Sequence, residues 1–311
     1  MKNTNYTNIT GFTSSSLAGS SSLKTNVSKN SRQKLLKEVF NILIKKVMNF
    51  DNTQNRMETY KKMLKKSLHY GDKILTVNPT MKKFTRGQSK GKYLINLFKT
   101  RRYLVRALWF LTKYAYQKKT ILFIGTSIPS SRSIATAALK TKSFFVNVRW
   151  LGGMLTNWKT MRKLIKKLKN LTKFQQTKSF LNSPKKEIAA GKKERERLEK
   201  YLKGMKMMKR FPQVVIMSSV SNDKSALLEC QKMGICNFSI VDTDCNPTFS
   251  DFIVPANDNS SSSIKFLLYY FAKAILIGKA LFNLKKKLKK FNTKKMRTKL
   301  QTPRSRNAAI S

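Results

Sequence analysis

Few residues of the chain combine the types and spacing that catalysis or metal binding requires. Gly125 and Thr126 end an apolar run of strand length, which is where doubly wound folds bind phosphate. The residues that follow form neither a GxGxxG nor a GxxxxGK[ST] pattern, so we interpret the segment as an ordinary turn. Asp242 and Asp244 also follow an apolar run. Two carboxylates without a phosphate loop are a weak Mg²⁺ ligand set, and we favour a capped turn.

Histidine and cysteine usage also argues against hydrolase and metal chemistry. His69 is the only histidine, so the chain lacks the further histidines that a histidine metal site needs and has one candidate for the histidine of a catalytic triad. Cys230, Cys236 and Cys245 do not have the spacing of a structural zinc site, and their odd number fits reduced thiols. We therefore predict no enzyme, no catalytic residue, no metal, no cofactor and no small-molecule substrate.

Net charge indicates the class of partner. The 311 residues include 65 Lys+Arg and 14 Asp+Glu, a formal net charge of +51. A folded protein this basic repels itself unless a polyanion neutralises it, and RNA is the expected polyanion. Acidic lipids are the alternative. The longest apolar run, residues 264–277, is too short for a membrane span and contains two lysines, so we expect no membrane partner.

The charge is also unevenly distributed. Residues 211–258 contain six acids and two bases, whereas residues 281–311 contain eleven bases and no acid. A uniform lysine bias would not exclude lysine from one folded region. The pattern predicts that one face of the protein meets a polyanion and another face does not.

The most distinctive segment is Arg149–Trp158, RWLGGMLTNW. Gly152 and Gly153 permit a sharp bend from strand into helix, and Trp150 and Trp158 are expected to pack in the core. The side chains that we predict to contact RNA are the basic residues of three segments and an asparagine that also suits a helix cap. They are Lys82, Lys83, Arg86, Lys90, Arg149, Asn157, Lys159, Arg162, Lys285, Lys286, Lys287, Lys289 and Lys290.

The elements that position these residues follow from apolar periodicity. Strand-length apolar runs with helical patterns between them predict a parallel sheet covered on both faces. A helical stripe on either side of Asn182–Pro184 predicts a helical hairpin inserted at about residues 155–210. Strands are expected at 121–125, 144–148, 214–218, 238–241 and 252–254, helices at 33–50, 93–116, 131–140 and 222–233, and an extended loop at 71–91.

Domain organisation follows from the same patterns. We predict a disordered extension over residues 1–30, because they are polar and aperiodic. An α/β domain is expected over residues 31–280, and a basic tail over residues 281–311.

Several motifs resemble one known family. The run VRWLGGMLTNWKT closely resembles the signature of small-subunit ribosomal protein two. His69–Gly71 with Asn78–Lys82, ILFIGT at 121–126, MGICNFSIVDTDCNP at 233–247 and FIVPANDN at 252–259 match that family in order. The family's second histidine is Asp72 here, and its basic pair after Gly-Thr is Ser127–Ile128, which puts those roles in doubt.

The resemblance implies both a fold and a function. The fold would be a flavodoxin-like, doubly wound parallel sheet with an inserted helical hairpin and basic terminal extensions. The function would be structural: binding ribosomal RNA and neighbouring small-subunit proteins near the head–body junction, in support of translation. The basic extensions and the lysine and asparagine bias suggest an organellar ribosome. We expect the mitochondrion, with the plastid as the alternative; a Rossmann-like nucleotide-binding enzyme is the competing functional class.

Overall fold

The structure, a computed structural model, describes residues 53–175, 177 and 184–301. Within these ranges, the side chains of residues 53–56 and 287–301 lie outside the description. The extension predicted over residues 1–30 and the helix predicted over residues 33–50 also lie outside it.

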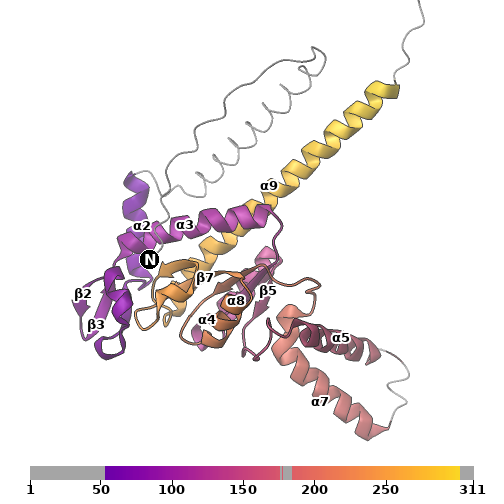
Figure 1. Cartoon of the computed structure of the whole chain (residues 1–311), viewed down its shortest axis with the longest axis horizontal. Helices are drawn as coiled ribbons and strands as arrows, with labels where there is room; N and C mark the ends of the chain where they lie inside the picture. The colour runs from indigo at the N-terminus through magenta and orange to yellow at the C-terminus, as the bar shows by residue number, and fades with distance from the viewer. Residues whose placement is uncertain (1–52, 176, 178–183, 302–311) are drawn as a thin grey trace, which may run out of the picture. The chain divides into compact units, whose positions relative to one another are not determined.

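Five parallel strands form the central sheet (Figure 1). Their order is β5-β4-β6-β7-β8, so the chain runs outward from β4 to one neighbour and then crosses to the other side. This is the flavodoxin-like order, with its switch point between β4 and β6, and it confirms the predicted fold class. The strands are β4 (Ile121–Ile124), β5 (Phe144–Val146), β6 (Val214–Met217), β7 (Cys236–Val241) and β8 (Phe252–Pro255).

Helices cover both faces of this sheet. Ile121 and Phe123 pack into one core with α3, α4 and α9, whereas Leu122 and Ile124 pack into a second core with α8 and the hairpin. Both faces are buried, and for that reason the strands are continuously apolar. The bounds are α3 (Leu97–Tyr116), α4 (Ile128–Thr141), α8 (Lys224–Lys232) and α9 (Ser261–Gln301); α2 (Thr53–Lys65) precedes them, and η4 (Pro247–Phe249) lies between β7 and β8.

The predicted hairpin is formed by α5 (Trp158–Phe174) and α7 (Lys185–Leu202), followed by the short helix η3 (Lys203–Met205). The two long helices lie side by side (Figure 1), and Leu168 and Leu198 are buried in the second core. Their apolar stripes continue the second core outward from the sheet.

The prediction of an extended loop over residues 71–91 is wrong. These residues form most of a three-stranded antiparallel sheet, order β1-β3-β2, made of β1 (Tyr70–Lys73), β2 (Thr85–Ser89) and β3 (Lys92–Ile95), with η1 (Ile74–Thr76) and η2 (Pro79–Phe84) between the first two. The strands are short and largely exposed, so they lack the apolar alternation that marks a half-buried strand. Lys90 and Gly91 both have positive φ and close a tight β2–β3 turn.

Helix boundaries differ from those expected at α3, α4 (Ile128 rather than residue 131 as its start) and α8 (Lys224–Lys232 rather than 222–233), and α9 was not expected as a helix. Helix α3 begins at Leu97 rather than Tyr93, because the Asn96 side chain accepts the Phe98 N–H and caps the helix. Helix α9 runs through the expected start of the tail at residue 281, and Leu281 is buried in the body of the protein. The first residues of the predicted tail are therefore part of a helix packed on the core.

Candidate nucleic-acid interface

The bend between β5 and α5 is organised by one carboxylate from another element. Glu229 of α8 accepts hydrogen bonds through Oε1 from Trp150 Nε1 at 3.0 Å and the Gly153 N–H at 2.8 Å. Its Oε2 accepts the backbone N–H groups of Leu155 and Thr156 at 2.9 and 3.1 Å and the Thr156 hydroxyl at 3.3 Å. Backbone donors that a bend would leave unpaired are satisfied by a single side chain.

Glu229 stays ionised in this position. Partial burial acts to raise its pKa, but the hydrogen bonds from Trp150 and from the backbone of Leu155, Thr156 and Gly153 outweigh it. The pKa of Glu229 is therefore lowered, and the carboxylate carries its full charge at neutral pH.

The two glycines of the bend have different roles. Gly153 has φ +85°, in the left-handed region that side chains with a Cβ avoid. Gly152 has no positive φ, and a Cβ there would meet open space. The prediction that Gly152 is needed for the bend is therefore wrong, and Gly153 alone fills that role.

The two tryptophans and the asparagine lie where the sequence indicates. Trp150 is buried, and Trp158 is half-buried with its ring 5.8 Å from that of Phe211. Asn157 caps α5 by accepting the Thr160 N–H at 3.4 Å. Its side-chain oxygen is thus used within the protein, although the residue is exposed.

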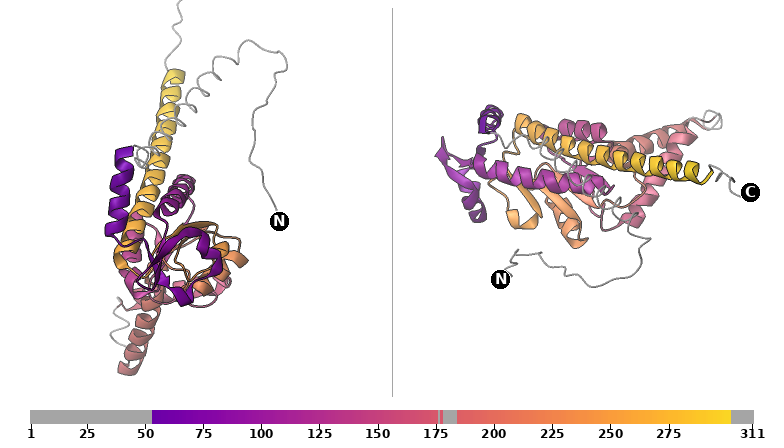
Figure 2. Two further views of the ribbon diagram at one scale, coloured as in Figure 1. Left: turned by 90° about the vertical axis from the view of Figure 1, so that its left-hand side faces the viewer. Right: turned by 90° about the horizontal axis from the view of Figure 1, so that it is seen from above.

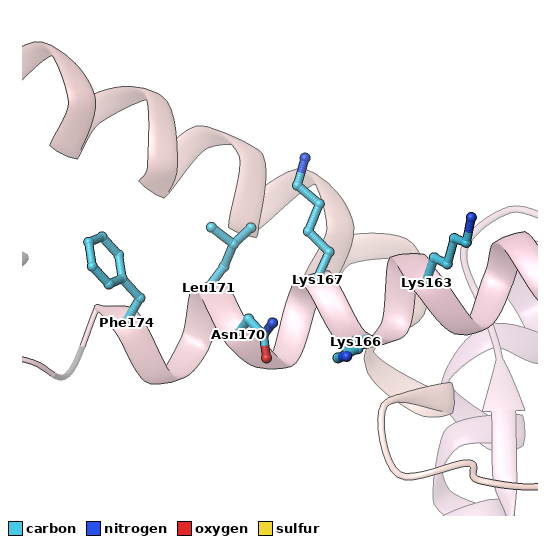
Figure 3. Close-up of a pocket in the computed structure, with 6 residues that line it drawn as sticks. All are labelled: Lys163, Lys166, Lys167, Asn170, Leu171 and Phe174. Atoms are coloured by element: carbon cyan, nitrogen blue, oxygen red, sulfur yellow. The ribbon is translucent and has the colours of Figure 1, made fainter.

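Exposed bases lie on both sides of the bend and continue along α5. Arg149, Lys159 and Arg162 are all exposed, so the structure places these predicted RNA contacts around the root of the hairpin. Beyond them, an open groove of about 490 Å³ lies along α5 (Figure 3). Its lining combines lysine ammonium groups with apolar surface: Lys163, Lys166, Lys167, Asn170, Leu171 and Phe174. Sequence reasoning did not predict any of these residues to contact RNA.

One lysine of the groove is paired. Lys167 Nζ lies 2.6 Å from Glu194 Oε1 on α7, which joins the two helices of the hairpin across their exposed side. An exposed ion pair of this kind contributes roughly 0–1 kcal/mol. Because the ion pairs of the described residues involve one of the three groove lysines, the groove remains cationic overall.

A second basic surface lies on η2 and the small sheet. Lys82, Lys83, Arg86 and Lys90 are all exposed, as their predicted role requires. The hairpin and the small sheet extend from opposite ends of the central sheet (Figures 1 and 2). The structure thus does not gather the predicted RNA contacts into one site, but distributes them over separate surfaces.

The predicted contacts of the tail are described only in part. Lys286 is exposed, and Lys285 is half-buried with its ammonium 5.2 Å from the centroid of the Tyr116 ring. The side chains of Lys287, Lys289 and Lys290 lie outside the described residues.

The carboxyl edge of the parallel sheet carries acids in place of a phosphate loop. Asp242 is fully buried, and its oxygens accept the N–H groups of Thr243 at 2.6 Å and Asp258 at 3.2 Å. Burial and then the charge of Asp258 raise the pKa of Asp242 well above its ordinary value. Asp223 is also buried and accepts the Thr126 hydroxyl at 2.7 Å, and burial raises its pKa to about 6.

This edge has structural roles. The Thr243 hydroxyl accepts the Asp72 N–H at 2.8 Å, and the Thr243 carbonyl accepts the Asn78 N–H, which fastens the small sheet to the central one. Within the described part of the chain, no group of three or more His, Cys, Asp or Glu side chains is arranged to hold a metal. No helix among the described residues is both long and apolar enough to cross a membrane.

Comparison with known proteins gives a consistent result. The family model described as "Ribosomal protein S2" matches residues 63–278, which include the bend, the hairpin and the whole parallel sheet. "Small ribosomal subunit protein uS2c" of Stigeoclonium helveticum is 62% identical over 265 residues, 85% of this chain and 84% of that protein. The proteins of the same name from Oltmannsiellopsis viridis and Chlorella vulgaris are 42% and 38% identical, over 71% and 70% of this chain and 93% and 81% of theirs.

These relatives correct the expected location. They carry the name of the chloroplast protein, uS2c, so the mitochondrial prediction is wrong and the plastid alternative is the one supported. Lysine and asparagine bias did not distinguish between the two organelles.

The first testable consequence concerns Glu229. Glu229→Gln exchanges a charged acceptor for a neutral amide that brings an NH₂ group toward N–H donors, and it should lower the free energy of unfolding by about 1.5–3 kcal/mol at pH 7. Because the pKa of folded Glu229 is lowered, its contribution is complete above the unfolded value of roughly 4.3 and disappears as the pH falls through the folded value. Denaturant unfolding at several pH values measures this, with the exposed Glu196→Gln as control. Equal stability of the two variants at pH 7 would contradict the assignment.

The second consequence separates the two glycines. Gly153→Val should reduce stability by roughly 1–3 kcal/mol, because valine is strained at positive φ. Gly152→Val should change it by less than about 0.5 kcal/mol, as at an ordinary surface position. Thermal unfolding of both variants measures the difference, and the reverse order would contradict the assignment.

Proposed function

The chain belongs to the ribosomal protein S2 family, and on that premise we propose that it is a structural, rRNA-binding protein of the small subunit of a plastid ribosome. The observation that carries the proposal is the family match over residues 63–278, together with relatives named as small-subunit proteins over most of this chain. Proteins of this family are structural components of the ribosome rather than enzymes.

The charge distribution supports RNA as the partner. Exposed bases lie on η2, the β2–β3 turn, the bend and α5. Buried acids such as Asp223 and Asp242 lie at the carboxyl edge of the sheet, where they accept hydrogen bonds within the protein. Helix α5 contains no acid, so a polyanion that approaches it meets ammonium and guanidinium groups; the glutamates of the hairpin all lie on α7.

The proposed contacts are of the kind that bind phosphate. Lysine and arginine side chains that extend from helices and a tight turn position an RNA backbone without reading its sequence. The predicted contacts Arg149, Lys159 and Arg162 have the firmest support, because the bend that carries them is held to the sheet by Glu229. A location near the head–body junction, and contact there with neighbouring small-subunit proteins, remain predictions.

The proposal predicts steep salt dependence. Binding of the full chain to plastid small-subunit rRNA should weaken linearly in a plot of log K against log salt, because each neutralised phosphate releases counterions. The variant R149Q/K159Q/R162Q should lower the magnitude of that slope by roughly 2.1–2.7, at about 0.7–0.9 for each of three contacts. The control K224Q/K232Q, on α8 within the acid-rich segment 211–258, should leave it nearly unchanged.

Two results would count against the proposal. A flat salt response of the unaltered protein would exclude phosphate binding as its basis. Migration of the protein free of small subunits in plastid lysate would exclude the ribosomal role itself.

A further inference from the structure

Helix α9 packs against two other helices near their C-terminal ends. It contacts both α3 and α4, and the views in Figure 2 show it running alongside α3. A Cβ at Gly278 would lie 2.5 Å from the Thr112 carbonyl oxygen, so the backbones of α9 and α3 approach closely there. This packing brings together chain segments that are far apart in the sequence.

Four lysines lie along this crossing, two beside the end of α4 and two beside the end of α3. Lys279 Nζ on α9 donates to the carbonyl oxygens of Thr141 and Lys142 at 2.5 and 3.3 Å, at the end of α4. One turn further along α9, the ring of Phe282 lies 4.1 Å from Lys118 Nζ, just beyond the end of α3. After one more turn comes Lys285, against the ring of Tyr116. We call Lys118, Lys142, Lys279 and Lys285 the lysine cluster.

The ammonium groups of Lys118, Lys279 and Lys285 contact carbonyl oxygens and aromatic rings rather than carboxylates. Lys279 and Lys285 are separated by about 9 Å along the helix axis, within a Debye length at physiological salt. The pKa of Lys279 is lowered, first by burial and then by the charge of Lys142. Among the described side chains, neither recorded ion pair involves a member of the cluster.

Two members also occupy unfavourable backbone positions. Lys118 has φ +60° and Lys142 has φ +51°, each immediately after a helix. Glycine and asparagine suit such positions, whereas a lysine Cβ is disfavoured there. In the isolated protein, backbone strain opposes lysine at these sites, whereas the partial negative charge of the preceding helix C-terminus favours a cation there. A bound polyanion would stabilise these positive charges further.

From this arrangement we infer that the lysine cluster is a further RNA-binding surface, which takes neighbouring phosphates of an rRNA segment. The inference rests on the proposed function and adds a surface to it. Helices α3, α4 and α9 cover one face of the sheet, and the hairpin root packs on the other. The protein would therefore contact RNA from both faces of its sheet.

The test removes the two exposed charges without straining the turns. K118N/K142N replaces lysine with a neutral residue that tolerates positive φ, and K224Q/K232Q on α8 removes the same charge elsewhere. Binding of the full chain to plastid small-subunit rRNA is measured across a salt series for both variants. The cluster variant should lose roughly 1.5 from the magnitude of the slope, and the control close to none. Unchanged melting temperatures establish that both variants are folded; if K118N/K142N is destabilised, K285Q alone should lower the slope by roughly 0.7–0.9.

The outcomes separate this inference from the proposed function. Equal slopes for the cluster variant and the control, with steep binding by the unaltered protein, would overturn the inference alone. A flat response of the unaltered protein would overturn the proposed function. Binding to vesicles that contain acidic lipids is measured as well. Loss of vesicle binding by the cluster variant, with rRNA binding unchanged, would assign the cluster to a membrane surface and overturn the inference.

Discussion

The carboxylate of Glu229 is the interaction on which the arrangement of the molecule depends. It accepts five hydrogen bonds from the bend between β5 and α5, through the side chains of Trp150 and Thr156 and three backbone N–H groups. Because Glu229 lies on α8, which packs on the sheet, the direction in which the hairpin leaves the sheet is fixed by the core. The bases that follow the bend therefore have defined positions relative to the rest of the S2-family domain.

The same principle explains how a chain of net charge +51 uses its few acids. Glu229 is ionised, but its charge is engaged by donors of the bend. Asp242 and Asp258 are buried beside each other, and burial raises the pKa of both, that of Asp258 to about 6. Several acids thus hold loops together inside the protein, while lysine and arginine outnumber acids on the hairpin, where four glutamates lie on α7, and on the small sheet. A surface of this kind suits a protein whose partner is a folded polyanion.

The sequence was sufficient for features that depend on local patterns. The parallel strands were predictable because both of their faces are buried and their residues are continuously apolar, and α5 was predictable from its helical stripe. The small sheet was not, because its strands lack an apolar face. Glu229 gave no signal, since its partners lie more than 70 positions away in the chain. The two bend glycines look alike in sequence, and only their backbone angles distinguish Gly153. The lysine cluster likewise exists only because α9 packs against the ends of α3 and α4.

The most direct test of the account is a map of protein–rRNA cross-links in assembled plastid small subunits. The account predicts cross-linked peptides from three regions: η2 with the β2–β3 turn, the bend with α5, and the segments that carry the lysine cluster. It predicts none from α8, whose acid-rich surroundings should face away from RNA. Cross-links concentrated on α8, with none on α5, would contradict the claim that internal use of the acids leaves the basic surfaces to bind RNA.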